Sequence, residues 1–111
     1  MTMSIDPLYA EKYPLLNTLF GGYFHQDFDF DYGSPEDTID AFLADVRPVD
    51  MSDFLVQNDA LLENATDASL ERTLAIMGNS FDYTTRDLNA RQWLNYVAVR
   101  VRAKIGCIGM I

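Results

Sequence analysis

The chain has 111 residues, 49% of them hydrophobic and 13% aromatic, which suits one globular domain over residues 1–111 with its own core. Its formal net charge of −9 is uneven: residues 1–71 hold 15 acidic and 2 basic side chains (net −13), and residues 72–111 hold 2 acidic and 6 basic ones (net +4). The acidic part would repel phosphate, which disfavours nucleic acid as its partner and favours a basic protein or simple solubility.

The cysteine count and the hydropathy of the chain indicate its cellular compartment. Cys107 is the only cysteine, and a lone thiol fits a reducing environment without disulfides. The N-terminus lacks a basic start followed by an apolar run, so no signal peptide is expected. No apolar run approaches the roughly 20 residues needed to span a bilayer. We therefore expect a cytoplasmic protein that does not enter the membrane.

The first helix is predicted to begin at Asp6-Pro7, because proline suits the first helical turn. Apolar residues then recur at three- and four-residue steps as far as Phe20. Pro14 predicts a kink or a split in this segment. The glycine pair at 21–22 is expected to end the helix.

Residues 21–35, GGYFHQDFDFDYGSP, predict a long aromatic and acidic connection between the first two helices. Over 25–32 the chain alternates strictly, and in an extended strand alternate side chains point to opposite sides. We expect Phe28 and Phe30, on one edge, to pack into the core. The other edge carries three carboxylates, Asp27, Asp29 and Asp31, which we expect to face solvent or a partner.

Three further helices are predicted from their caps and apolar spacing. The second begins at Ser34-Pro35 and ends before Pro48. Asp50 or Ser52 is expected to cap the third. The fourth is expected to begin after Thr66 and to end at Gly78.

The last helix is predicted to follow a cap at Thr84 or Thr85, with Trp93 buried at the head of its apolar stripe. This stripe recurs every four residues: Trp93, Val97, Val101 and Ile105. A strand is the alternative, because valines at 97, 99 and 101 also alternate with arginines. The long approach without a turn signal favours helix. The prediction is an all-α, single compact domain of about five helices.

Candidate chemistry is sparse. The spacing of Asp27, Asp29 and Asp31 is that of the first half of a calcium loop, but Tyr32 stands where the loop needs glycine and Thr38 where it needs the bidentate acid. No motif pairs a nucleophile with a base. We expect no cofactor, no metal and no enzymatic activity. The alternative left open is a small metal-binding or enzymatic domain that uses these three carboxylates.

Several segments together resemble the immunity proteins of bacterial contact-dependent growth inhibition systems. They are Tyr13-Pro14, Leu19-Phe20-Gly21-Gly22-Tyr23-Phe24-His25-Gln26-Asp27-Phe28-Asp29, and Tyr32-Gly33-Ser34-Pro35-Glu36. A weaker likeness continues through Leu61-Leu62, Leu70, Leu74 and Gly78 to Trp93-Leu94. Phe28 departs from the tryptophan found in many relatives, but a large aromatic still fills the place.

The resemblance implies a small helical cytoplasmic protein that binds and neutralises its cognate C-terminal toxin domain in a heterodimer. Many such toxins are nucleases with basic surfaces, which an acidic inhibitor would complement. On this basis the candidate partner-binding residues lie in the connection and the start of the second helix. They are Asp27, Asp29, Asp31, Tyr32, Glu36, Asp37 and Asp40.

Overall fold

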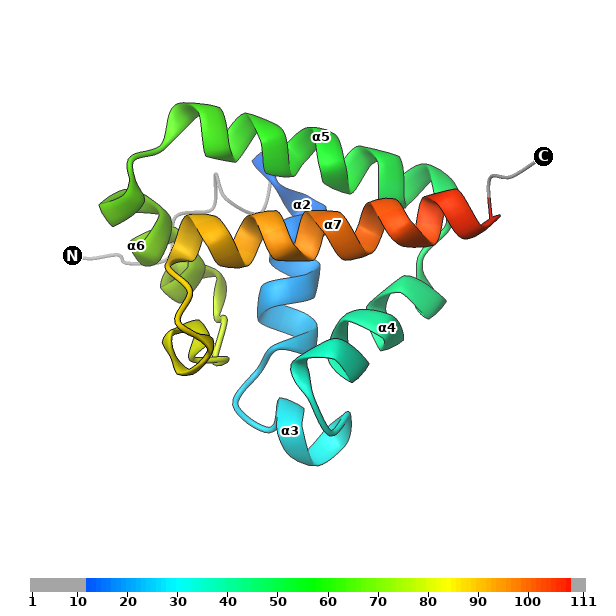
Figure 1. The fold of residues 1–111 in the computed structure, drawn as a ribbon, viewed down its shortest axis with the longest axis horizontal. Helices are drawn as coiled ribbons and strands as arrows, with labels where there is room; N and C mark the ends of the chain where they lie inside the picture. Colours follow the sequence, from blue (N-terminus) through cyan, green and yellow to red (C-terminus); the bar gives the residue numbers. More distant parts are fainter. Residues whose placement is uncertain (1–11, 109–111) are drawn as a thin grey trace.

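The computed structural model describes residues 12–108, and these residues fold into helices around one core (Figure 1). The elements are α2 (Pro14–Asn17), the π-helix η1 (Thr18–Tyr23), α3 (Phe28–Asp31), α4 (Pro35–Asp45), α5 (Pro48–Asn64), α6 (Asp67–Met77), the 3-10 helix η2 (Tyr83–Arg86) and α7 (Ala90–Ile108). No strand occurs within residues 12–108, so the all-α prediction is confirmed and the strand alternative for 97–101 is wrong. The predicted start at Asp6-Pro7 lies outside the described residues.

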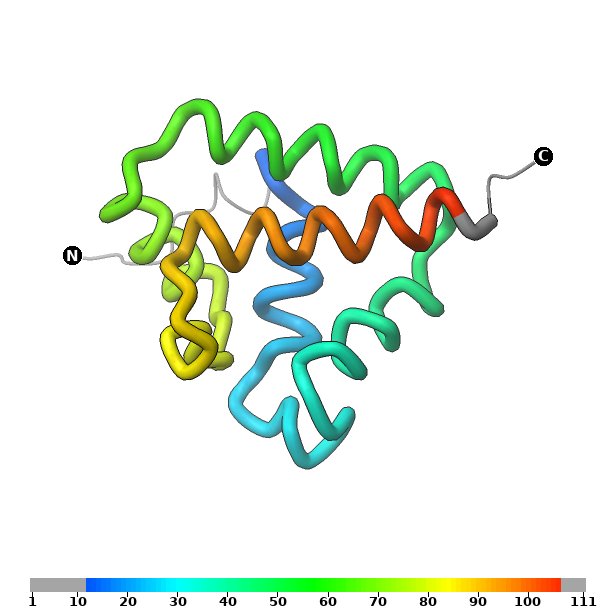
Figure 2. The backbone as a smooth tube through the Cα atoms, viewed as in Figure 1, coloured from blue at the N-terminus to red at the C-terminus, as the bar shows by residue number. Residues whose placement is uncertain are grey.

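Two long helices form the frame of the molecule. Helices α5 and α7 pack side by side and run in opposite directions, as the backbone trace in Figure 2 shows. The continuous α2–η1 segment packs on α5 and leads away from it to α3. Because α4 and α6 both contact η1, this central segment lies between them.

Several predicted helix boundaries are confirmed. The Ser34 hydroxyl accepts a hydrogen bond from the Asp37 amide at 3.0 Å, which caps α4. Thr66 caps α6 in the same way, since its hydroxyl accepts from the Ser69 amide at 3.1 Å. Gly78 ends α6 with a φ of 100°, a left-handed conformation that glycine adopts at little cost.

Two predicted caps are wrong. Helix α5 begins at Pro48, because the Arg47 amide donates to the Asp50 carboxylate at 3.1 Å and places Asp50 inside the first turn. Helix α7 begins at Ala90, whereas residues 84 and 85 belong to η2. Asn89 and Gln92 exchange side chain-to-amide hydrogen bonds of 2.8 and 2.9 Å at its start. This reciprocal arrangement is a capping box.

The glycine pair does not end the first helix, contrary to the prediction. The helix widens into η1, where the Phe24 amide donates to the Leu19 carbonyl five residues earlier at 3.0 Å. A Cβ on Gly21 would lie 2.3 Å from the Met77 carbonyl oxygen. Gly21 is therefore needed for the close approach of η1 to the end of α6. The spacing of apolar residues in the sequence does not reveal this contact.

Trp93 lies at the centre of the core and is fully buried, as predicted. Its ring is surrounded by aromatic rings from three segments, with centroids 5.4 Å from Phe24, 4.8 Å from Phe81 and 5.9 Å from Tyr96. Aromatic pairs at these separations add to the stabilisation from buried area. The core thus joins η1, the 79–82 link and α7.

Arginines of η2 and α7 face carboxylates of earlier helices. The four pairs are Arg86–Glu36 (2.6 Å), Arg91–Asp67 (2.7 Å), Arg100–Asp40 (3.0 Å) and Arg102–Asp59 (3.9 Å). These contacts join the basic C-terminal part of the chain to the acidic part before it. Much of the positive charge is therefore compensated within the molecule.

Candidate functional site

Helix α3 replaces the extended connection predicted for residues 25–32, and that prediction is wrong. The carbonyl of Asp27 accepts from the amides of Phe30 and Asp31 at 3.1 and 3.0 Å, which closes a helical turn. A four-residue helix is too short for its 3.6-residue period to be visible in the sequence. The observed alternation of aromatic and acidic residues therefore does not sort them onto two edges.

Two aromatic side chains hold the inner face of α3. Phe28 and Tyr32 are four residues apart and so share one side of the turn. The Phe28 ring lies 5.4 Å from the buried Phe24 ring, and Tyr32 stacks on Tyr23 at 5.7 Å. Phe28 packs against the core, as predicted. Tyr32, a candidate contact residue, is half-buried and helps to fix the turn.

Phe30 points the other way. Its relative exposure is 90%, so the prediction that it packs into the core is wrong. Two residues further along a helix correspond to a rotation of about 200°, which places Phe30 opposite the inner face set by Phe28. Sequence reasoning missed Phe30 as a surface residue because a strand would have placed both phenylalanines on the same side.

His25 fixes the approach to α3. Its Nδ1 accepts a hydrogen bond from the Asp27 amide at 3.1 Å, so the ring carries its proton on Nε2. That nitrogen lies 3.2 Å from the Asp31 carboxylate. His25 therefore joins both ends of the turn.

Four carboxylates lie on or beside α3, and we call them the acidic rim: Asp27, Asp29, Asp31 and Asp37. All four are exposed. Asp37 comes from α4, but its carboxylate lies close to Gly33, just after α3. A Cβ built on Gly33 would be 3.2 Å from that carboxylate. Within residues 12–108, Asp27, Asp29 and Asp37 form no ion pair with a basic side chain of this chain. Their charge is thus available to a partner.

The other two acidic candidates are engaged within the chain. Glu36 accepts from the Arg86 guanidinium at 2.6 and 3.0 Å and from the Tyr96 hydroxyl at 2.8 Å. The hydrogen bond from Arg86 is the largest influence on this carboxyl and lowers its pKa to about 2. Asp40 accepts from Arg100 at 3.0 Å. Both residues therefore join α4 to η2 or α7.

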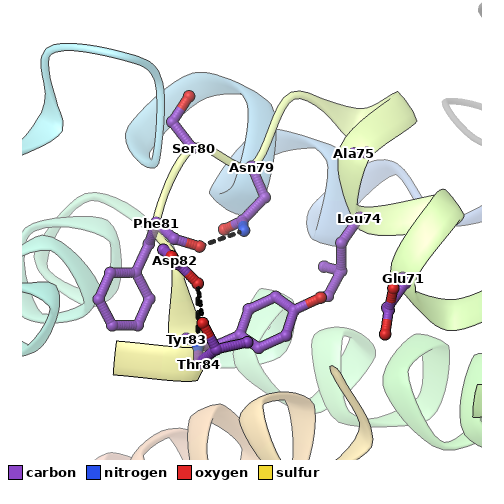
Figure 3. A pocket seen from close by; sticks show the side chains of 9 residues that line it. All are labelled: Glu71, Leu74, Ala75, Asn79, Ser80, Phe81, Asp82, Tyr83 and Thr84. Atoms are coloured by element: carbon purple, nitrogen blue, oxygen red, sulfur yellow. Dashed lines mark hydrogen bonds between the residues drawn. The ribbon is translucent and has the colours of Figure 1, made fainter. Parts of the chain in front are cut away.

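A pocket of about 330 Å³ lies between α6 and the link to η2 (Figure 3). Its lining includes the carboxylates of Glu71 and Asp82, with the Tyr83 ring between the link and α6. Asp82 accepts from the Thr84 amide at 3.1 Å, which fixes its orientation. Sequence reasoning did not identify this pocket, because its walls come from separate elements and no motif marks them.

A second depression of about 430 Å³ lies between α4 and α7. The Asp40–Arg100 pair crosses its wall, and the exposed Val99 lies beside it. Two of its polar side chains, Asp40 and Arg100, are therefore already paired with each other. In the pocket beside α6 the Thr84 hydroxyl donates to the Asp82 carboxylate, a contact that belongs to the cap of η2.

Two classes of site have no support in the described part of the chain. Within residues 12–108, no three His, Cys, Asp or Glu side chains converge as metal ligands would. The carboxylates of Asp27, Asp29 and Asp31 do not form such a group. None of the helices in this range is long and apolar enough to cross a bilayer.

Comparison with known proteins adds the following. The family model described as "CdiI immunity protein" matches residues 12–101. A chain in the crystal structure of a CdiA-CT/CdiI complex from Y. kristensenii 33638 superposes with a TM-score of 0.77 at 26% sequence identity. The match covers 84% of this chain and 96% of that chain. None of the curated proteins matches the sequence.

Proposed function

Because the chain belongs to the CdiI immunity protein family, we propose that it binds and neutralises the cognate C-terminal toxin domain of a contact-dependent growth inhibition system. The observation that carries this proposal is the family match over residues 12–101. The similar solved structure, a CdiA-CT/CdiI complex, supports a heterodimer of toxin domain and inhibitor. The protein then acts in the bacterial cytoplasm as a stoichiometric inhibitor and not as an enzyme.

The partner surface is basic and belongs to a nuclease. Support comes from Asp27, Asp29 and Asp37 of the acidic rim, which are exposed and form no ion pair within residues 12–108. A nuclease attracts phosphate with basic side chains, and the same side chains attract a carboxylate-rich protein. Complementary charge of this kind speeds encounter and excludes wrong partners.

In this proposal the acidic rim and Tyr32 contact the toxin. Glu36 and Asp40 instead stabilise the position of α4. Their arginine partners, Arg86 and Arg100, hold α4 against η2 and α7. This division follows from the pairing within the chain. An ion pair that is already formed has less to gain from a new cation than an unpaired carboxylate has.

The test is direct mixing with the purified toxin domain encoded beside this protein. We expect a 1:1 complex in size-exclusion chromatography and loss of toxin activity at equimolar ratio. Degradation of RNA and DNA by the free toxin, and its arrest in the complex, test the nuclease assignment separately. A toxin that stays active and unbound at excess inhibitor would refute the proposed function.

Charge reversal tests the surface. The rim variant, Asp29→Lys with Asp37→Lys, is compared with an α5 control, Asp53→Lys with Glu63→Lys, which changes the net charge equally. All four side chains are exposed. We expect the rim variant to associate more slowly and to lose much of the salt dependence, because rim charges act mainly on encounter. Equal rates for both variants would place the interface elsewhere.

A further inference from the structure

Phe30 is an exposed aromatic side chain on a turn that is fixed from behind. Its exposure of 90% contrasts with Phe28, two residues earlier, which packs against the core. A single exposed apolar residue is ordinary in itself. Here, however, the turn around it is held by the inner rings of Phe28 and Tyr32 and by the His25–Asp31 contact.

The surroundings of Phe30 resemble the centre of a protein interface. Hot spots combine a central aromatic side chain with a ring of polar groups that exclude water. Asp27 lies three residues before Phe30 and so on the same side of the turn, and Asp29 and Asp31 flank it. A phenylalanine also has few rotatable bonds, so fixing it on binding costs little entropy.

The geometry points to Phe30 as the central contact of the toxin interface, inserted into an apolar socket that lysines or arginines surround. This inference rests on the proposed function and adds a residue that determines affinity. The acidic rim sets the chemistry of the occupant. Carboxylates around an apolar side chain fit a socket with a basic edge, whereas a wholly apolar groove would leave them desolvated and unpaired.

A second copy of this chain fits the surface poorly. In a two-fold symmetric dimer the same patch meets itself, so the two acidic rims would face each other and repel. Arg86, Arg91 and Arg100 each already lie within 3.0 Å of a carboxylate of their own chain, which leaves Arg72 and Lys104 among the exposed cations for a head-to-tail contact. The formal net charge of −9 on each copy opposes such a contact. The occupant is therefore a different, basic protein.

The experiment compares Phe30→Ala with two alanine variants that separate its role from folding and from general hydrophobicity. Phe28→Ala removes the neighbouring ring that packs inward, and Val56→Ala removes a side chain that is 68% exposed on α5. For each protein, the melting temperature and the dissociation constant for the cognate toxin domain are measured. Circular dichroism verifies that the helices are intact.

We expect Phe30→Ala to melt like wild type and to bind at least about 30-fold more weakly, the loss that defines a hot spot. The change should lie mainly in the dissociation rate. Val56→Ala should bind like wild type, and Phe28→Ala should melt lower. Phe30→Leu, which keeps an apolar side chain, should recover a large part of the affinity.

The outcomes separate this inference from the proposed function. If wild type binds the toxin and Phe30→Ala binds it with a dissociation constant within twofold of wild type, the role of Phe30 is overturned but the proposed function stands. Wild type that binds no toxin would overturn both. A concentration-dependent dimer of wild type that Phe30→Ala abolishes, with toxin binding unchanged, would identify a second copy as the occupant and also overturn the inference.

Discussion

Replacing Glu36 with glutamine should destabilise the fold in a pH-dependent way. The carboxylate joins α4 to Arg86 of η2 and to Tyr96 of α7, three segments that are remote in sequence. Glutamine keeps the size and can still accept from the Tyr96 hydroxyl. The substitution therefore removes mainly the charge that Arg86 faces.

The pKa of Glu36 gives the size of the effect. A fall from 4.5 to about 2 corresponds to roughly 3 kcal/mol if it were fully expressed in stability. The side chains of Glu36 and Arg86 are 29% and 43% exposed, so solvent screens the pair and reduces the expected loss to about 1–2 kcal/mol. Because the pKa is lowered in the folded state, this stability is fully present above about 4.5. It disappears as the pH falls towards about 2.

Urea unfolding followed by circular dichroism measures this difference at pH 7, 5, 4 and 3. We expect wild type to exceed Glu36→Gln at pH 7 and 5, with the gap narrowing at pH 4 and 3. Glu63→Gln is the matched control, because Glu63 is exposed and lies in no ion pair of the described residues. A gap below about 0.3 kcal/mol at pH 7, or one that does not change with pH, would refute the reasoning.

Three further substitutions test the core, the helix contact and the acidic surface. Trp93→Ala should lower the free energy of unfolding by about 3–5 kcal/mol, because the indole is fully buried; a loss below 1 kcal/mol in urea would contradict this. Gly21→Ala should cost about 1–3 kcal/mol in the same assay, since its Cβ would lie 2.3 Å from a backbone oxygen of α6, and an unchanged midpoint would show that η1 can shift. Stopped-flow association of the rim variant with toxin should vary less with salt than that of the α5 control.

Some helix boundaries of this fold can be predicted from nearby residues, whereas others depend on contacts between distant parts of the chain. Ser34, Thr66 and Gly78 act within one turn of their own position, so their roles could be predicted from residue type and neighbours. The role of Gly21 depends on a carbonyl 56 residues later, at Met77, and no local pattern encodes such an approach. Threonines 84 and 85 are also good caps, so residue type alone predicts a start of α7 that is too early.

The candidate site was only partly predictable for the same reason. The acidic residues were found, because charge can be read directly from the sequence. The Glu36 carboxylate is bound by Arg86, which is 50 residues away in the sequence. Asp37, next to Glu36, has no such partner among the described residues. The direction of Phe30 depended on whether residues 28–31 turn or extend. The proposed function rests on likeness to a family, which no spacing of charges alone indicates.

The position of the arginine contacts also sets an order of assembly during synthesis. The side chains that join the acidic helices, and the indole at the centre of the core, come from η2 and α7, which follow the other described helices. A nascent chain that has released only residues 1–71 carries a net charge of −13 and repels itself. At about 5–20 residues per second, translation adds residues 72–111 within several seconds. The packing of the described helices is therefore complete only once α7 has left the ribosome.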